Sequence, residues 1–223
     1  MAQPARQCPI MSNPRPRSSL LSGLPPHGRG LRIGLLGGSF NPAHAAHRQI
    51  SRIALKRLGL DAVWWLVTPG NPLKDNRSLP SLAVRMAEAA ALADDPRIIV
   101  TGVEARWGLR FTIDVLRQLK QRCPGTHFVW LMGSDNLAGF ARWRNWPAIA
   151  ATVPIAVVDR PGTTLTALSG QAAARLARAR LPEGEARALP NRKPPAWVFL
   201  HGRRSALSST ALREAKARAE AQQ

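Results

Sequence analysis

The chain alternates short apolar runs with segments whose apolar residues recur at helical spacing, and this alternation limits the folds open to it. The 223-residue sequence begins the pattern with an apolar run over 32–36, followed by helix-period positions over 45–58. Further strands are expected over 62–68, 97–101, 127–132, 154–158 and 197–200, and further helices over 81–93 and 112–121. Strands that alternate with helices predict an α/β fold, Rossmann-like and doubly wound, whose mostly parallel sheet carries helices on both faces.

Composition divides the chain into a tail and one domain. Residues 1–29 are rich in Pro, Arg, Ser and Gly without periodicity, which predicts a disordered N-terminal extension. Residues 30–223 are long enough for one domain with a sizeable core. Within it, 162–195 is rich in Ala, Arg and Pro, and we expect there only an exposed helix over 171–180. We find no apolar run of membrane-spanning length and no secretory signal, so we expect a cytoplasmic protein.

The chain is strongly basic, with 32 Lys and Arg against 13 Asp and Glu, a net charge of +19. The excess is spread along the sequence rather than gathered into one stripe. This favours a general attraction for anionic substrates over nucleic-acid binding, which stays the alternative from a different class. The two cysteines, Cys8 and Cys123, have neither metal-ligand spacing nor the pattern of a disulfide framework, so we expect two reduced thiols.

The junction between the first expected strand and helix, residues 37–47, carries the strongest chemical signal. Two glycines let the backbone approach a ligand closely. His44 and His47 then fall on one face of the first helical turn, beside unpaired backbone N–H groups and the positive end of the helix dipole. Such a site suits polyphosphate. Zinc is a weaker competitor, because no third ligand has suitable local spacing, and we expect no metal site built from protein side chains.

Two further stretches, 69–74 and 133–136, also follow expected strands directly. Ligands of open parallel sheets bind outside the carboxyl ends of the strands, at the point where the strand order reverses. We therefore predict that these stretches and 37–47 converge on one edge of the sheet.

The motifs resemble those of a known enzyme family. Residues 37–47 are similar to the nucleotidyltransferase signature Gly-x-Phe-Asp-Pro-x-His-x-Gly-His, and 207–213 resemble the second signature, Ile-Ser-Ser-Thr-x-Ile-Arg. Residues 69–74, 111–116 and 133–137, with Trp143 and Trp146, look like bacterial nicotinate-nucleotide adenylyltransferase. The resemblance spans about 31–213. It implies transfer of AMP from ATP to nicotinic acid mononucleotide, giving deamido-NAD and pyrophosphate, with Mg²⁺ bound through the ATP phosphates.

The resemblance also implies roles for individual residues. Catalysis would fall to His44, His47 and Arg213. The ATP site would comprise Gly37, Gly38, Ser39, Phe40, His44, His47, Asp135, Ser208, Ser209, Thr210 and Arg213. The mononucleotide would contact Asn41, Lys74, Thr112, Trp143 and Arg144.

Three positions depart from the family pattern. Asn41 replaces the usual Asp, Ala46 stands where the signature has Gly, and Arg144 follows Trp143 where relatives often have an aromatic residue. The last bears on the nicotinate pocket more than on the reaction. The nearest alternative enzyme is another small-molecule nucleotidyltransferase, such as phosphopantetheine adenylyltransferase, which shares chiefly the two terminal motifs. The oligomeric state is left open.

Overall fold

The described part of the protein is built on one parallel seven-stranded sheet. The computed structural model describes residues 23–70, 78–160 and 163–201. The strands are β1 (Arg32–Gly38), β2 (Ala62–Val67), β3 (Ile98–Thr101), β4 (His127–Gly133), β5 (Ile155–Val158), β6 (Arg180–Leu181) and β7 (Trp197–Leu200). Their order is β3-β2-β1-β4-β5-β7-β6, and every pairing is parallel. The predicted α/β, Rossmann-like fold class is confirmed.

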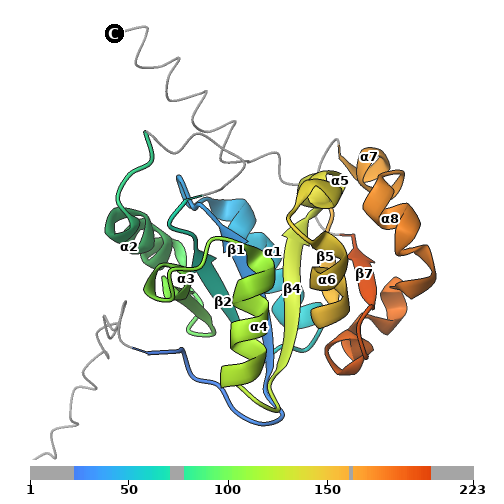
Figure 1. Ribbon diagram of the computed structural model, residues 1–223, viewed down its shortest axis with the longest axis horizontal. Coiled ribbons are helices and arrows are strands. Elements are labelled where there is room, and N and C mark those ends of the chain that lie inside the picture. Colours follow the sequence, from blue (N-terminus) through green and yellow to red (C-terminus); the bar gives the residue numbers. More distant parts are fainter. Residues whose placement is uncertain (1–22, 71–77, 161–162, 202–223) are drawn as a thin grey trace, which may run out of the picture.

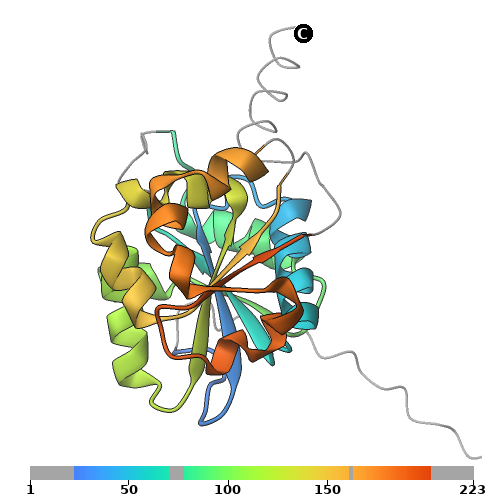
Figure 2. The ribbon, with the colours of Figure 1, turned by 90° about the vertical axis from the view of Figure 1, so that its right-hand side faces the viewer.

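Helices cover both faces of the sheet, as Figures 1 and 2 show. The α-helices are α1 (Ala45–Arg57), α2 (Leu82–Leu92), α3 (Val103–Arg106), α4 (Thr112–Arg122), α5 (Ser134–Gly139), α6 (Trp146–Thr152), α7 (Thr164–Leu168) and α8 (Gln171–Arg175). Short 3-10 helices are η1 (Phe140–Arg142), η2 (Ala177–Ala179) and η3 (Glu183–Asn191). In Figure 2 the sheet is seen edge-on, with α1 on one side and α4 and α6 on the other.

The core consists of two apolar layers, one on each face. Because strand side chains alternate between faces, Leu35 of β1 packs in the layer with α4 and α6, while its neighbour Leu36 packs in the layer with α1 and α2. Trp64 and Trp65 of β2 divide in the same way. Strands buried on both faces explain why the sequence shows near-continuous apolar runs there.

The strand order reverses between β1 and β4, since β2 and β3 lie on one side of β1 and β4 and β5 on the other. Each helix that follows a parallel strand starts at the carboxyl end of that strand, so α1 and α5 begin at this reversal. The loops after β1, β2, β4 and β5 therefore meet at one edge, as predicted for 37–47 and 133–136.

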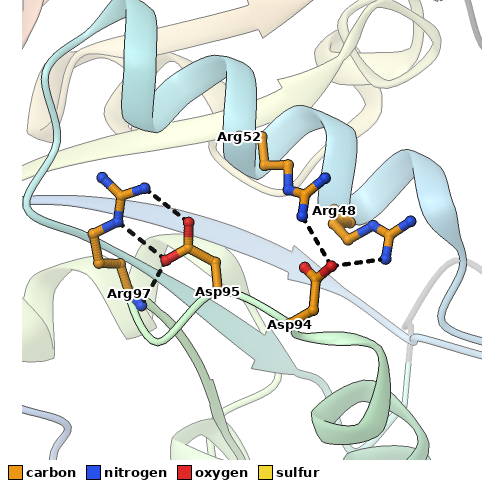
Figure 3. A network of polar contacts seen from close by, with 5 residues as sticks. All are labelled: Arg48, Arg52, Asp94, Asp95 and Arg97. Atoms are coloured by element: carbon orange, nitrogen blue, oxygen red, sulfur yellow. Dashed lines mark hydrogen bonds and ion pairs between the residues drawn. The ribbon is translucent and has the colours of Figure 1, made fainter.

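Exposed ion pairs fasten α1 to the end of α2 (Figure 3). The Asp94 carboxylate accepts from Arg48 at 3.0 Å and from Arg52 at 2.8 Å, both on α1. Asp95, next in the chain, binds the side chain of Arg97 at 2.7 Å. Such solvated pairs contribute little individually, so the position of α1 depends mainly on its buried face.

The structure differs from sequence expectation at both ends of the domain. Residues 23–29, assigned by composition to the extension, pack on the domain: Pro25 is buried, Leu24 touches the core, and the carbonyl of Gly28 accepts a hydrogen bond from Thr126. The expected exposed helix over 171–180 ends at Arg175, and its Ala172 and Ala173 are buried. Among the described helices, none is long and apolar enough to cross a membrane.

Candidate active site

Gly37, near the carboxyl end of β1, lies directly against the Trp130 ring of β4, and only glycine leaves room for this contact. A Cβ atom at Gly37 would lie 2.6 Å from Cη2 of Trp130 on β4. The chain then turns through Ser39 and Phe40, the latter with a positive φ of 48°, which is uncommon for a bulky residue. Phe40 is nevertheless fully buried. Its ring therefore belongs to the core and is not a surface for a ligand.

The two histidines lie together at the start of α1, as predicted. His44 is the N-cap residue and His47 lies in the first turn, and their ring centroids are 4.0 Å apart. The backbone N–H of His44 donates to Nδ1 of His47 at 3.2 Å. Because Nδ1 accepts this bond, the neutral His47 ring carries its proton on Nε2 and can donate it to a ligand. Nδ1 of His44 is buried and has no hydrogen-bond partner within the described part of the chain.

His47 is also held from behind by aromatic packing. Its ring lies 4.5 Å from that of Phe40, which stacks on Trp65 of β2 at 5.2 Å. The Trp65 indole N–H donates to Ser51 at 2.7 Å, and the Ser51 hydroxyl donates to the carbonyl of His47 at 2.9 Å. This network fixes both the ring and the backbone of His47 against the sheet. Only 9% of His47 is exposed, so most of the residue packs within the protein and a small part faces a ligand.

Both imidazoles are neutral at physiological pH. Burial lowers the pKa of His44 to about 4, helped by the nearby charge of Arg160 and opposed by that of Asp135. Burial, with His44 and Arg160, lowers the pKa of His47 to about 3. The pair can therefore offer N–H donors to an anion without carrying charge beforehand. A bound polyphosphate would favour protonation and strengthen these contacts.

Arg160, which follows β5, supplies a cation that the sequence reasoning missed. Its guanidinium is paired with Asp135 at 3.2 Å, and its backbone N–H donates to the Ser134 hydroxyl at 2.8 Å. Nε of Arg160 is buried without a partner among the described residues. Arg160 comes two residues after the strand expected over 154–158, at the same edge of the sheet as 37–47. Position at that edge was the signal that could have identified Arg160.

Three of the residues expected around nicotinate, Thr112, Trp143 and Arg144, lie near Trp130 or the start of α4. Trp143 meets Trp130 edge-to-face at 6.1 Å, so Trp143 adjoins the residue that packs on Gly37. Thr112 begins α4 directly after Phe111, the N-cap residue, so Thr112 itself is not the cap. The exposed Arg144 places its guanidinium 4.3 Å from the Phe111 ring. The Arg144 side chain thus points toward the start of α4, a direction that the sequence alone does not determine.

Several predicted residues lie outside the described part of the chain, namely Lys74, Ser208, Ser209, Thr210 and Arg213. Gly38 ends β1, and the half-buried Asn41 lies in the turn before α1. Within 23–70, 78–160 and 163–201, no three His, Cys, Asp or Glu side chains group as metal ligands. Cys123 is buried and free.

The chain is similar in sequence and in fold to proteins of known families. Residues 35–215 match the model of the family described as Cytidylyltransferase-like. The chain is 61% identical over 183 residues to a probable nicotinate-nucleotide adenylyltransferase of Methylorubrum extorquens, covering 82% of this chain and 99% of the relative. A relative of the same name in Brucella suis is 52% identical, with 82% and 95% covered. In fold, it resembles a Plasmodium falciparum nicotinic acid mononucleotide adenylyltransferase complexed with NaAD, at 16% identity and a TM-score of 0.61, with 82% and 83% covered.

Proposed function

Because the chain belongs to the cytidylyltransferase-like family and, within it, to the nicotinate-nucleotide adenylyltransferases, we propose that it transfers AMP from ATP to nicotinic acid mononucleotide. An oxygen of the mononucleotide phosphate attacks the α-phosphorus of ATP. The bond from that phosphorus to the bridging oxygen breaks, and pyrophosphate leaves as nicotinic acid adenine dinucleotide forms. The transfer is direct and in line, without a covalent enzyme intermediate.

The observation that carries the proposal is the pair of buried neutral imidazoles at the start of α1, where the strand order reverses. Transfer of this kind needs little covalent chemistry from the protein, which must align the reactants and stabilise charge. Nε2–H of His47 donates to the α-phosphate, whose oxygens gain charge as the bond to pyrophosphate breaks. His44, Arg160 and the backbone N–H groups around Ser39 stabilise the phosphates beside it.

The remaining roles extend the same proposal. Lys74 and the segment with Ser209, Thr210 and Arg213 bind the distal phosphates. Asp135 lies at the nucleotide end and holds Arg160 in place. Thr112, Trp143, Arg144 and Asn41 surround the mononucleotide.

We also propose that Mg²⁺ enters bound to the ATP phosphates. The chemistry of the described residues fits this, because His44, His47 and Arg160 offer donors to phosphate oxygens, and the phosphates would themselves hold the ion. When bound, the ion neutralises phosphate charge. A cytoplasmic location is part of the same proposal.

The test is pyrophosphate release from ATP with nicotinic acid mononucleotide, nicotinamide mononucleotide or phosphopantetheine offered separately. The proposal predicts strong release with the first and weak release with the others. Strong release with phosphopantetheine alone would assign the chain to the alternative activity. Release independent of acceptor would show ATP hydrolysis and would contradict adenylyl transfer.

A further inference from the structure

A buried arginine outside the predicted site joins the loops at the carboxyl edge of the sheet. Arg85 of α2 is 1% exposed. Its Nη1 donates to the carbonyl of Ser39 at 2.7 Å and to that of Thr68 at 2.8 Å. Nη2 donates to Pro69 at 3.3 Å, and Nε donates to Pro80 at 2.9 Å. One guanidinium thus binds four backbone carbonyls.

These four carbonyls come from three separate segments. Ser39 lies in the loop after β1, which leads to the histidine pair. Thr68 and Pro69 lie in the loop after β2, which leads to the stretch containing Lys74. Pro80 precedes α2, whose N-cap Ser81 accepts from the N–H of Val84 at 3.3 Å. Arg85 therefore fixes the loops after β1 and β2 relative to each other and to α2.

The contact to Ser39 also sets the direction of a neighbouring N–H group. The peptide between Ser39 and Phe40 is trans, so its N–H points opposite to its carbonyl. Because that carbonyl points at Arg85, the N–H of Phe40 points away from Arg85. The positive φ of Phe40 is uncommon for an aromatic residue, and the hydrogen bond to Arg85 holds the chain in this turn.

The hydrogen-bond partners of Arg85 explain why an arginine, and not an apolar residue, lies at this buried position. Burying a guanidinium is unfavourable unless its donors are satisfied, and here the described partners are carbonyl groups rather than a carboxylate. An apolar residue of similar volume would avoid that desolvation, but it would leave these four carbonyl groups without the donors that Arg85 supplies. What the arginine adds is a rigid planar fork that reaches several acceptors at once.

We propose that Arg85 is a positioning residue for adenylyl transfer, which holds the loops after β1 and β2 in the arrangement that receives the ATP phosphates. The inference rests on the proposed function. It assigns Arg85 no contact with substrate. Its effect passes through the backbone of Ser39 on one side and of Thr68 and Pro69 on the other.

The test compares Arg85→Lys with Arg117→Lys, a matched substitution on the exposed side of α4, where the Arg117 side chain is 58% exposed. Lysine keeps the charge but cannot reach four carbonyls with one planar group. Measured well below the melting temperature and per folded molecule, Arg85→Lys should lower kcat/KM for ATP by ~10–100-fold, the range expected for a small misplacement of reacting groups. Arg117→Lys should match the wild type.

Arg85→Gln, which is uncharged and has a shorter planar group, serves as the second variant. The same loss of kcat/KM for ATP in whichever variant folds supports the inference. A lower melting temperature with wild-type kcat and KM would overturn it, because Arg85 would then act only on stability. An inactive wild type would instead refute the proposed function.

Discussion

His47 has two roles that substitution can separate: its Nδ1 accepts a hydrogen bond within the protein, and its Nε2–H is proposed to donate to the α-phosphate. Nδ1 accepts the backbone N–H of His44 at 3.2 Å, and the ring packs on Phe40 at 4.5 Å. His47→Ala leaves that N–H buried without its acceptor, at about 1–3 kcal/mol. It also loses an aromatic contact worth about 0.5–1.5 kcal/mol. We expect His47→Ala to lower the free energy of unfolding by ~2–4 kcal/mol.

His47→Asn isolates the chemical role. The Asn amide oxygen lies near the place of Nδ1 and keeps the bond from His44, whereas the donor at the position of Nε2 is lost. This variant should therefore be more stable than His47→Ala. Both should lose activity by ~10²–10³-fold, the range for removal of one positioned donor. His47→Gln, whose amide reaches the position of Nε2, should recover part of the rate while losing the bond from His44.

Chemical unfolding and steady-state kinetics on the three variants give both quantities. We expect the free energy of unfolding to depend on the acceptor at the position of Nδ1, and the rate to depend on the donor at the position of Nε2. Wild-type kcat in His47→Asn would refute the assignment of Nε2–H to the α-phosphate. Equal stability of the Ala and Asn variants would refute the bond from His44 as a stabilising contact.

Three further predictions concern the helix start, the tail and a buried acid. Ala46→Gly should lower the free energy of unfolding by ~1–2 kcal/mol, because Gly disfavours helix and a buried methyl is lost. The KM for ATP should change only a few fold, and a large rate gain would show that the methyl obstructs phosphate. Deleting 1–22 should leave the melting temperature unchanged, whereas deleting 1–29 should lower it by removing Leu24 from the core; equal melting temperatures would contradict this packing. Burial raises the pKa of Glu104 to about 7, so the stability conferred by its protonated form is lost as pH rises through that value. Glu104→Gln should therefore reduce the fall in unfolding free energy between about pH 5 and pH 8 by on the order of 2 kcal/mol. An unchanged fall would contradict the raised pKa.

The sequence predicts the long elements well, because each has enough residues to show its period. The strands β1 to β5 and β7 and the helices α1, α2 and α4 lie close to their predicted bounds. Ser81, the first residue of the helix expected over 81–93, is the N-cap of α2. The stretch 162–195 instead folds into pieces of two to nine residues, most of them too short for a periodic pattern.

The candidate site is predictable in part for the same reason. The pairing of His44 and His47 follows from helical spacing, which the sequence shows directly. The burial of His47 does not, because Phe40 and Trp65 come from the preceding turn and the next strand, and only tertiary packing brings them to its ring. Arg85 could have been noticed as a charge on an apolar helix face, but its four acceptors come from three loops and are visible only in the fold.

Competition between two acceptors tests the central claim most directly. The enzyme would be given ATP with equal concentrations of nicotinic acid mononucleotide and its nicotinamide counterpart, and the two dinucleotide products would be measured by mass. The ring carboxylate can accept charge-assisted hydrogen bonds worth ~1.5–3 kcal/mol from donors around Thr112, while the amide would leave one donor facing another. The account predicts the acid dinucleotide in at least ~10–100-fold excess. Equal amounts would contradict acid specificity, and formation of neither dinucleotide would contradict adenylyl transfer to a pyridine mononucleotide.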